Sequence, residues 1–160
     1  MKLIFLDIDG VLNCKYTLDR ISDNSSIIGV EDKKLDLLKN IVDSCNDECR
    51  IILTSSWKID WYKDNKNSQG IGANYLDRKF KEHGLSIYDK TKDMSWNRGK
   101  GIRDYIRDSK EDIRQFLVLD DSIFRDYGKE KIIEHLVLTD IIHGLDEYHT
   151  TRAIEILNKK

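Results

Sequence analysis

Short apolar runs alternate with helical patterns along this chain. The runs cover residues 3–6, 50–53, 85–88, 115–121 and 135–140. Between them, apolar residues recur at helical spacing over 31–42, 75–83 and 101–107, and Ala153, Ile154 and Leu157 form one stripe near the C-terminus. Strands that alternate with helices predict an α/β fold, a Rossmann-like three-layer sandwich with a mostly parallel five-stranded sheet.

Polar residues stand where three of these runs end. Residues 5–13 read FLDIDGVLN, so Asp7 and Asp9 follow the first run directly. Strands of a parallel sheet that is covered on both faces are normally apolar throughout, which places these carboxylates at the carboxyl end of the first strand. The second run ends in Thr54 and Ser55, and the fourth in a pair of aspartates, Asp120 and Asp121.

Two interpretations of these strand ends are open. Asp, Ser and Thr are the usual residues of helix caps and turns, which accounts for any one strand end. Three such ends with four carboxylates favour a common site, because ligands of open parallel sheets bind outside the carboxyl ends of the strands.

Four carboxylates in one place require a cation. Mg²⁺ prefers carboxylates together with water and phosphate oxygens, whereas the D-I-D-G stretch lacks the further ligands of a calcium-binding EF-hand loop. Magnesium in turn favours a phosphate ester as the substrate. One carboxylate can attack phosphorus and form an aspartyl-phosphate, and a second one, two residues further on the same side of the backbone, can protonate the leaving group.

Composition and charge narrow the class of protein. The chain has 160 residues, 39% of them hydrophobic and 35% charged, which predicts one globular domain over residues 1–160. No apolar run is long enough for a membrane span or a signal peptide, so we expect a cytoplasmic protein without a membrane partner. The odd count of three cysteines (Cys14, Cys45 and Cys49) favours free thiols.

The charge is spread unevenly along the chain. A net charge of −2 argues against a strongly basic nucleic-acid-binding protein. Residues 57–100 nevertheless carry ten Lys or Arg against six Asp or Glu, so a polyanionic partner would meet this segment. Trp57, Trp61 and Trp96 lie in the same segment, where they either stack on bases or pack into the protein.

The FLDIDGVLN stretch resembles the first motif of the haloacid dehalogenase (HAD) superfamily, whose phosphatases carry D-x-D-G-[VT]-[LI] at the end of the first strand. IILTS at 51–55, RGK at 98–100 and LVLDD at 117–121 resemble the hydroxyl, basic and acidic motifs of that superfamily, in the same order. The likeness spans nearly the whole chain. Dehalogenases proper lack the second aspartate of the first motif, so Asp9 points to phosphoryl chemistry.

The resemblance implies catalytic roles for Asp7, Asp9, Thr54 and one basic residue. Asp7 would be the nucleophile, and Asp9 the general acid and base. The basic residue, which would balance Asp7 and stabilise the phosphoryl group, is Lys100 or Arg98. We favour Lys100, because it opens a helix whose N-terminus would attract phosphate.

The resemblance also implies the binding residues. Thr54, or as a second choice Ser55, would hydrogen-bond a phosphoryl oxygen near Gly10, with Lys100 contacting the same group. The Asp9 backbone carbonyl would also contact the metal. The expected Mg²⁺ ligands are Asp7, Asp9, Asp120 and Asp121.

The spacing of the motifs leaves little room for a cap. Residues 13–30 allow a flap, and residues 57–98 a small insertion, so the expected enzyme has a minimal cap or none and an open site. T-S-S-W after the second strand, R-G before the third helix and H-G-L near the C-terminus resemble the small HAD domains of RNA-repair proteins. The phosphatase domain of polynucleotide kinase-phosphatases is a more distant likeness. These resemblances imply an RNA or DNA end, or a nucleotide, as the phosphorylated substrate.

A different class of function remains open. The same fold and carboxylates would serve a non-catalytic Mg²⁺- or phosphate-binding module, or a regulatory domain of the response-regulator receiver type. A receiver needs its acceptor aspartate in the middle of the chain. Here the acidic pairs follow the first and fourth strands, so the receiver interpretation fits poorly.

Overall fold

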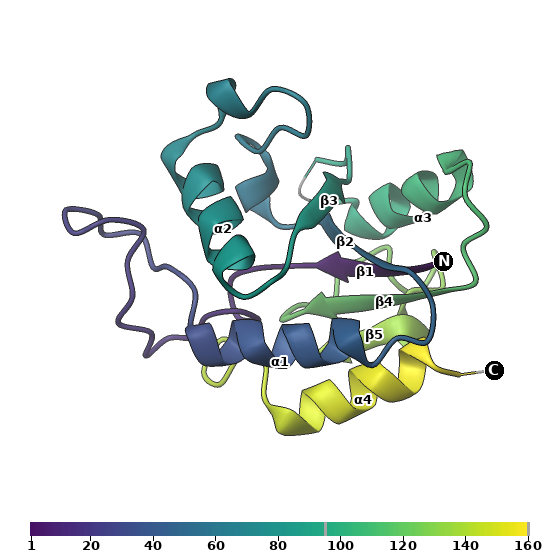
Figure 1. The fold of residues 1–160 in the computed structure, drawn as a ribbon. Coiled ribbons are helices and arrows are strands. Elements are labelled where there is room, and N and C mark those ends of the chain that lie inside the picture. The colour runs from purple at the N-terminus through teal and green to yellow at the C-terminus, as the bar shows by residue number, and fades with distance from the viewer. Residues whose placement is uncertain (95, 160) are drawn as a thin grey trace.

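The structure is a computed structural model that describes residues 1–94 and 96–159. Within these residues, five strands form one parallel sheet in the order β3-β2-β1-β4-β5 (Figure 1). The strands are β1 (Lys2–Leu6), β2 (Cys49–Leu53), β3 (Ile87–Lys90), β4 (Gln115–Asp120) and β5 (Leu136–Leu138). The helices are α1 (Asp32–Asp43), α2 (Ile71–Glu82), α3 (Arg98–Asp108) and α4 (Glu147–Leu157).

Two apolar cores, one on each face of the sheet, make the three layers. Ile4 and Leu6 of β1 face one core, which the apolar sides of α1, α2 and α4 complete. Leu3 and Phe5 face the other core, where Ile102 of α3 packs. Because neighbouring side chains of a strand point to opposite faces, a strand buried on both faces must be apolar at every position. The predicted α/β sandwich is confirmed.

The structure corrects the predicted bounds of three elements. The helix predicted over 75–83 begins at Ile71, inside the segment 57–98 that was expected to be a small insertion, and the turns Ser56–Lys58 and Lys66–Ser68 are also helical. The first residue of α2 gave no sign of the helix in the sequence, because Ile71 faces solvent and does not belong to the buried apolar stripe. β3 begins two residues later than predicted, since the chain is still turning after Gly84, which has φ 66°.

Helix α3 begins at Arg98 rather than at residue 101. Gly99 and Gly101 are poor helix formers, which hides the first turn from an analysis of sequence periodicity. The carboxylate of Asp126 accepts hydrogen bonds from the backbone N–H of Gly99 (3.1 Å) and of Lys100 (2.8 Å) and so caps this turn. The cap comes from the loop after β4.

Residues 13–30 project from the body of the protein between β1 and α1 (Figure 1). Within this segment, Arg20 and Ile28 form an isolated antiparallel β-bridge. Leu18 lies exposed to solvent. Cys14, Cys45 and Cys49 carry free thiols. No described helix is both long enough and apolar enough to cross a membrane.

The register of the sheet aligns the three polar strand ends. Leu6 of β1 pairs with Leu53 of β2 and with Leu119 of β4. The next residues therefore stand at one level: the Asp7 N–H donates to the Leu119 carbonyl at 2.9 Å, and the Thr54 N–H donates to the Leu6 carbonyl at 2.9 Å.

Candidate active site

Three carboxylates meet at the carboxyl end of β1 and β4. One oxygen each from Asp7, Asp120 and Asp121 lies within 4.8 Å of the other two. Asp7 is 7% exposed and Asp120 is fully buried. Like charges this close raise each other's energy when ionised, so the group favours a cation or a proton between its members. Three of the four expected metal ligands are thus brought together.

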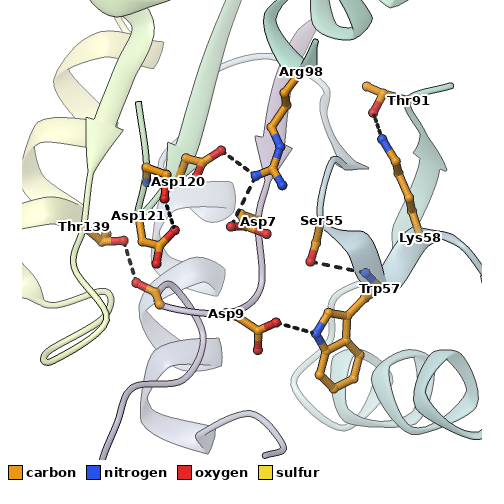
Figure 2. A network of polar contacts seen from close by, with 12 residues as sticks. Asp7, Asp9, Ser55, Trp57, Lys58, Thr91, Arg98, Asp120, Asp121 and Thr139 are labelled. Carbon is orange, nitrogen blue, oxygen red and sulfur yellow. Dashed lines mark hydrogen bonds and ion pairs between the residues drawn. The ribbon is translucent and has the colours of Figure 1, made fainter. Parts of the chain in front are cut away.

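Arg98 is the basic residue that reaches this cluster. Its Nη1 lies 3.2 Å from Asp7 Oδ2 and 2.6 Å from Asp120 Oδ2 (Figure 2). Burial by itself would lower the pKa of Arg98, but the two carboxylates more than offset this and raise it. The guanidinium therefore remains charged and neutralises part of the cluster.

Lys100 lies outside the cluster, contrary to our preference for it. Its ammonium is exposed and pairs with Asp104 one turn along α3. Residues two apart on a helix point about 200° away from each other, so Arg98 and Lys100 cannot both face the sheet. The N-terminal amides of α3, which were expected to attract phosphate, are occupied by Asp126.

The environment of Asp7 shifts its protonation. Burial raises the pKa of this carboxyl to about 6, although the Arg98 charge opposes the shift. The nearby Asp120 raises it further, and a hydrogen bond from Ser55 lowers it. A carboxyl with this pKa is ionised above neutral pH and takes up a proton in mild acid.

Asp120 has two further partners that sequence analysis did not identify. The Tyr127 hydroxyl donates to Asp120 Oδ2 at 2.7 Å, and the Ser122 N–H donates to Oδ1 at 3.0 Å. Tyr127 is fully buried. Burial raises the pKa of Asp120 in spite of Arg98 and Tyr127. A buried tyrosine needs a partner for its hydroxyl, but no sequence pattern tells which carboxylate supplies it.

The Thr54 hydroxyl is buried and has no hydrogen-bond partner among the described residues. A buried hydroxyl without a partner costs free energy, so such groups are expected to have a ligand or water to bind. The neighbouring Ser55 oxygen accepts from the Trp57 N–H at 3.4 Å. Of the two expected hydroxyls, Thr54 is the one left available.

The Asp9 carboxylate is not a member of the three-carboxylate cluster. The indole Nε1 of Trp57 donates to its Oδ2 at 3.0 Å (Figure 2). Asn13 Nδ2 donates to its Oδ1 at 2.9 Å. The Asp9 side chain therefore lies outside the cluster, and the expected contact of the Asp9 backbone carbonyl with the metal stays a prediction.

Gly10 makes the turn between Asp9 and the rest of the loop. Its φ is 74°, and a Cβ at this position would lie 2.4 Å from Asp121 Oδ2. The Thr139 hydroxyl donates to the Gly10 carbonyl at 2.6 Å. Glycine is required here for both the backbone conformation and the close approach of Asp121.

Lys58 is a second buried cation, at the end of the helical turn that follows β2. Lys58 Nζ donates to Thr91 Oγ1 at 2.9 Å and to Asp93 Oδ1 at 2.8 Å. The contacts tie the segment after β2 to the loop after β3, and Figure 2 shows the one with Thr91. No motif indicated Lys58, because a lysine in a polar loop normally faces solvent.

The three tryptophans differ in their surroundings. Trp61 is 1% exposed, and its indole donates to Asp77 at 2.9 Å, so packing accounts for it. Trp96 is 75% exposed. Trp57 is half-buried and contacts Asp9.

A cavity of about 570 Å³ lies between β3 and α3, with Tyr88 and Tyr105 among its walls. Asp93 and Asn97 at one end of it come from the loop that leads to Arg98. The three clustered carboxylates are not part of its lining. The cavity is therefore separate from the carboxylate cluster, whose chemistry follows from its own side chains.

Comparison with protein families matches residues 3–150 to the model described as "HAD domain in Swiss Army Knife RNA repair proteins". The match includes every residue of the cluster. Neither the comparison with curated proteins nor that with solved structures yields a match.

Proposed function

The chain belongs to the family of HAD domains of Swiss Army Knife RNA repair proteins, and from this premise we propose that it is a Mg²⁺-dependent phosphomonoester hydrolase acting through an aspartyl-phosphate on Asp7. The observation that carries the proposal is the position of Asp7. It stands buried at a strand end, beside two further carboxylates and in contact with Arg98.

The donor set fits magnesium. Asp7, Asp120 and Asp121 offer hard oxygen ligands, and one guanidinium balances only part of their charge. These three residues would hold the ion. When bound, Mg²⁺ neutralises charge on the phosphoryl group and orients it toward the nucleophile.

Asp7 and Asp9 divide the chemistry between them. An oxygen of Asp7 attacks phosphorus while the bond from phosphorus to the leaving oxygen breaks, and Asp9 gives its proton to that oxygen. In the second half, a water oxygen attacks phosphorus and gives a proton to Asp9, while the bond from phosphorus to the Asp7 oxygen breaks. Inorganic phosphate leaves, and Asp7 is again a free carboxylate.

The remaining residues bind and orient the phosphoryl group. Arg98 stabilises the negative charge that its oxygens carry in the transition state. The partnerless Thr54 hydroxyl donates to one of these oxygens. Lys100 has no part in this step, because its ammonium pairs with Asp104.

We propose a nucleic-acid end or a nucleotide as the substrate. The family description, the excess of Lys and Arg over residues 57–100 and the exposed Trp96 support this choice. A site with a minimal cap would also admit a large substrate. We also propose that the chain forms a single domain with little or no cap and that it acts in the cytoplasm.

The second candidate function is a module that binds Mg²⁺ and phosphate without turnover. The contact of Asp9 with Trp57 and Asn13 favours it, since an acid held away from the cluster need not take part in catalysis. Such a module would bind phosphorylated ligands in the presence of Mg²⁺ and leave them intact.

A phosphatase screen tests the proposal. The purified chain is incubated with Mg²⁺ and an aryl phosphate, nucleotides, sugar phosphates and oligonucleotides phosphorylated at the 3′ or the 5′ end, with EDTA as the control. We expect Mg²⁺-dependent release of phosphate, lost in Asp7→Asn, and accumulation of phospho-enzyme in Asp9→Asn. Turnover that survives Asp7→Asn would contradict the assignment of Asp7 as the nucleophile. Binding without release of phosphate would favour the second candidate.

A further inference from the structure

Two side chains from different loops hold the Asp9 carboxylate. Asn13 Nδ2 contacts one oxygen at 2.9 Å and Trp57 Nε1 the other at 3.0 Å. Figure 2 shows Asp9 between the carboxylate cluster and the Trp57 indole. We propose that Trp57 and Asn13 are positioning residues that aim the proton of Asp9 at the leaving group. The inference rests on the proposed phosphatase function.

Asn13 cannot rotate its amide without losing other contacts. Its Oδ1 accepts from the Gly10 N–H at 2.9 Å, and its Nδ2 also donates to the Gly29 carbonyl at 3.0 Å. The side chain is 2% exposed. These contacts assign the amide orientation and direct its N–H toward Asp9.

The Trp57 indole is held by α2. A Cβ at Gly72 would lie 3.6 Å from the indole ring, so the helix passes close to it. The Tyr75 ring lies 6.5 Å from the indole, centre to centre. Tyr75 in turn is buried, and its hydroxyl accepts from the Val30 N–H at 3.0 Å. The segment 57–98 thereby supports the acid of the site through Trp57.

The chemistry of the two partners decides where a proton on Asp9 can lie. An indole N–H can only donate, and the Asn13 amide presents its donor side. Neither group can accept a proton from a neutral Asp9. The acidic O–H must therefore point away from both, to the open side of the carboxyl, where it can reach the oxygen of a leaving group. The ionised form keeps both hydrogen bonds while it acts as the base.

Leaving-group dependence separates this role from simple support of the fold. An aryl oxide leaves readily without a proton, whereas an alkoxide or a ribose oxygen needs one. In Trp57→Phe, we expect kcat/KM on alkyl and nucleoside phosphates to fall about 10- to 100-fold, with kcat/KM on nitrophenyl phosphate changed less than about twofold. The ratio kcat/KM is the measure to use, because it reports the steps up to departure of the leaving group and leaves out the later hydrolysis of the aspartyl-phosphate, in which Asp9 acts as the base on every substrate.

The chain offers a matched control. Trp61→Phe removes the same kind of bond, from an indole to the carboxylate of Asp77, at a buried position where packing accounts for the side chain. It should leave the ratio of alkyl to aryl turnover unchanged. Asn13→Ser, which removes the other donor, should reproduce the selective loss, and it tests the proposal independently should Trp57→Phe not fold by circular dichroism.

The failures of the two proposals can be told apart. If the unmodified protein hydrolyses neither kind of ester with Mg²⁺, the proposed function fails and this inference with it. If it does hydrolyse them, an equal loss on both substrates, no loss, or faster alkyl turnover in folded Trp57→Phe would overturn the positioning role alone.

Discussion

Arg98 at the first position of α3 reaches back to Asp7 at the end of β1, with 3.2 Å between Nη1 and Oδ2. The same nitrogen lies 2.6 Å from Asp120 Oδ2. A single guanidinium thus joins the end of β1 to the end of β4, and its removal would leave buried carboxylates without a counter-charge.

Replacing Arg98 should therefore affect both activity and stability. We expect Arg98→Ala to lower kcat at least about 100-fold and the free energy of unfolding by about 3 kcal/mol, because it breaks a buried ion pair on one side only. Phosphate release and urea denaturation measure the two effects. Lys100→Ala is the comparison: its pair is exposed, so stability should change by less than about 0.5 kcal/mol. A larger loss of kcat in Lys100→Ala than in Arg98→Ala would instead identify Lys100 as the basic residue.

The raised pKa of Asp7 predicts a pH dependence of magnesium binding. In the metal-free folded state this carboxyl has a pKa of about 6, against an ordinary 3.8, so the folded state binds the proton more tightly than the unfolded state does. The stability of the metal-free protein should fall as pH rises from about 4 to about 6. Magnesium needs the ionised form, so its stabilising effect should grow over the same range.

Thermal unfolding with Mg²⁺ or with EDTA at pH 5 and pH 8 tests this dependence. The increase in Tm caused by Mg²⁺ should be larger at pH 8. In Asp7→Asn the difference between the two pH values should shrink. An equal Mg²⁺ effect at both pH values in the unmodified protein would contradict the linkage to Asp7.

Tyr127 should contribute to stability through Asp120. Tyr127→Phe removes the hydroxyl that donates to Asp120 at 2.7 Å and leaves a buried carboxylate with one donor fewer. We expect a loss of about 1 to 3 kcal/mol in the free energy of unfolding. Tyr148→Phe, at a position 70% exposed, should have almost no effect in the same urea titration. Equal stability of the two variants would argue against the buried hydrogen bond.

Gly10 should not tolerate a side chain. Gly10→Ala would add a Cβ to a residue whose φ is 74°, and this Cβ would lie 2.4 Å from Asp121 Oδ2. We therefore expect the free energy of unfolding to fall by about 1 to 3 kcal/mol and Mg²⁺ to bind more weakly. Isothermal titration with Mg²⁺ and denaturation measure these changes. Gly128→Ala is the matched control, because a Cβ there has no neighbour within 4 Å. Unchanged Mg²⁺ affinity in a folded Gly10→Ala would show that Asp121 does not bind the ion.

The alternation of apolar runs and helical patterns was enough to predict the sheet. Each strand predicted from sequence exists, and every one pairs in parallel. The runs at β1, β2 and β4 are strongly apolar because both faces of these strands are buried. The bounds of α2 and α3 were less predictable, since exposed Ile71 and the glycines of α3 carry no periodic signal.

The sequence by itself determined that Asp7, Thr54 and Asp120 stand at the ends of strands, because the length of an apolar run marks where a buried strand stops. That these three strands are neighbours is a property of the folded sheet. Only the tertiary structure decided that Arg98 rather than Lys100 faces Asp7. The direction of a side chain on a helix depends on where the helix begins, and α3 begins where Asp126, from a distant loop, caps it. The partners of Asp9 were hidden for the same reason. Trp57 reaches it across 48 positions of the chain, and α2 holds the indole there.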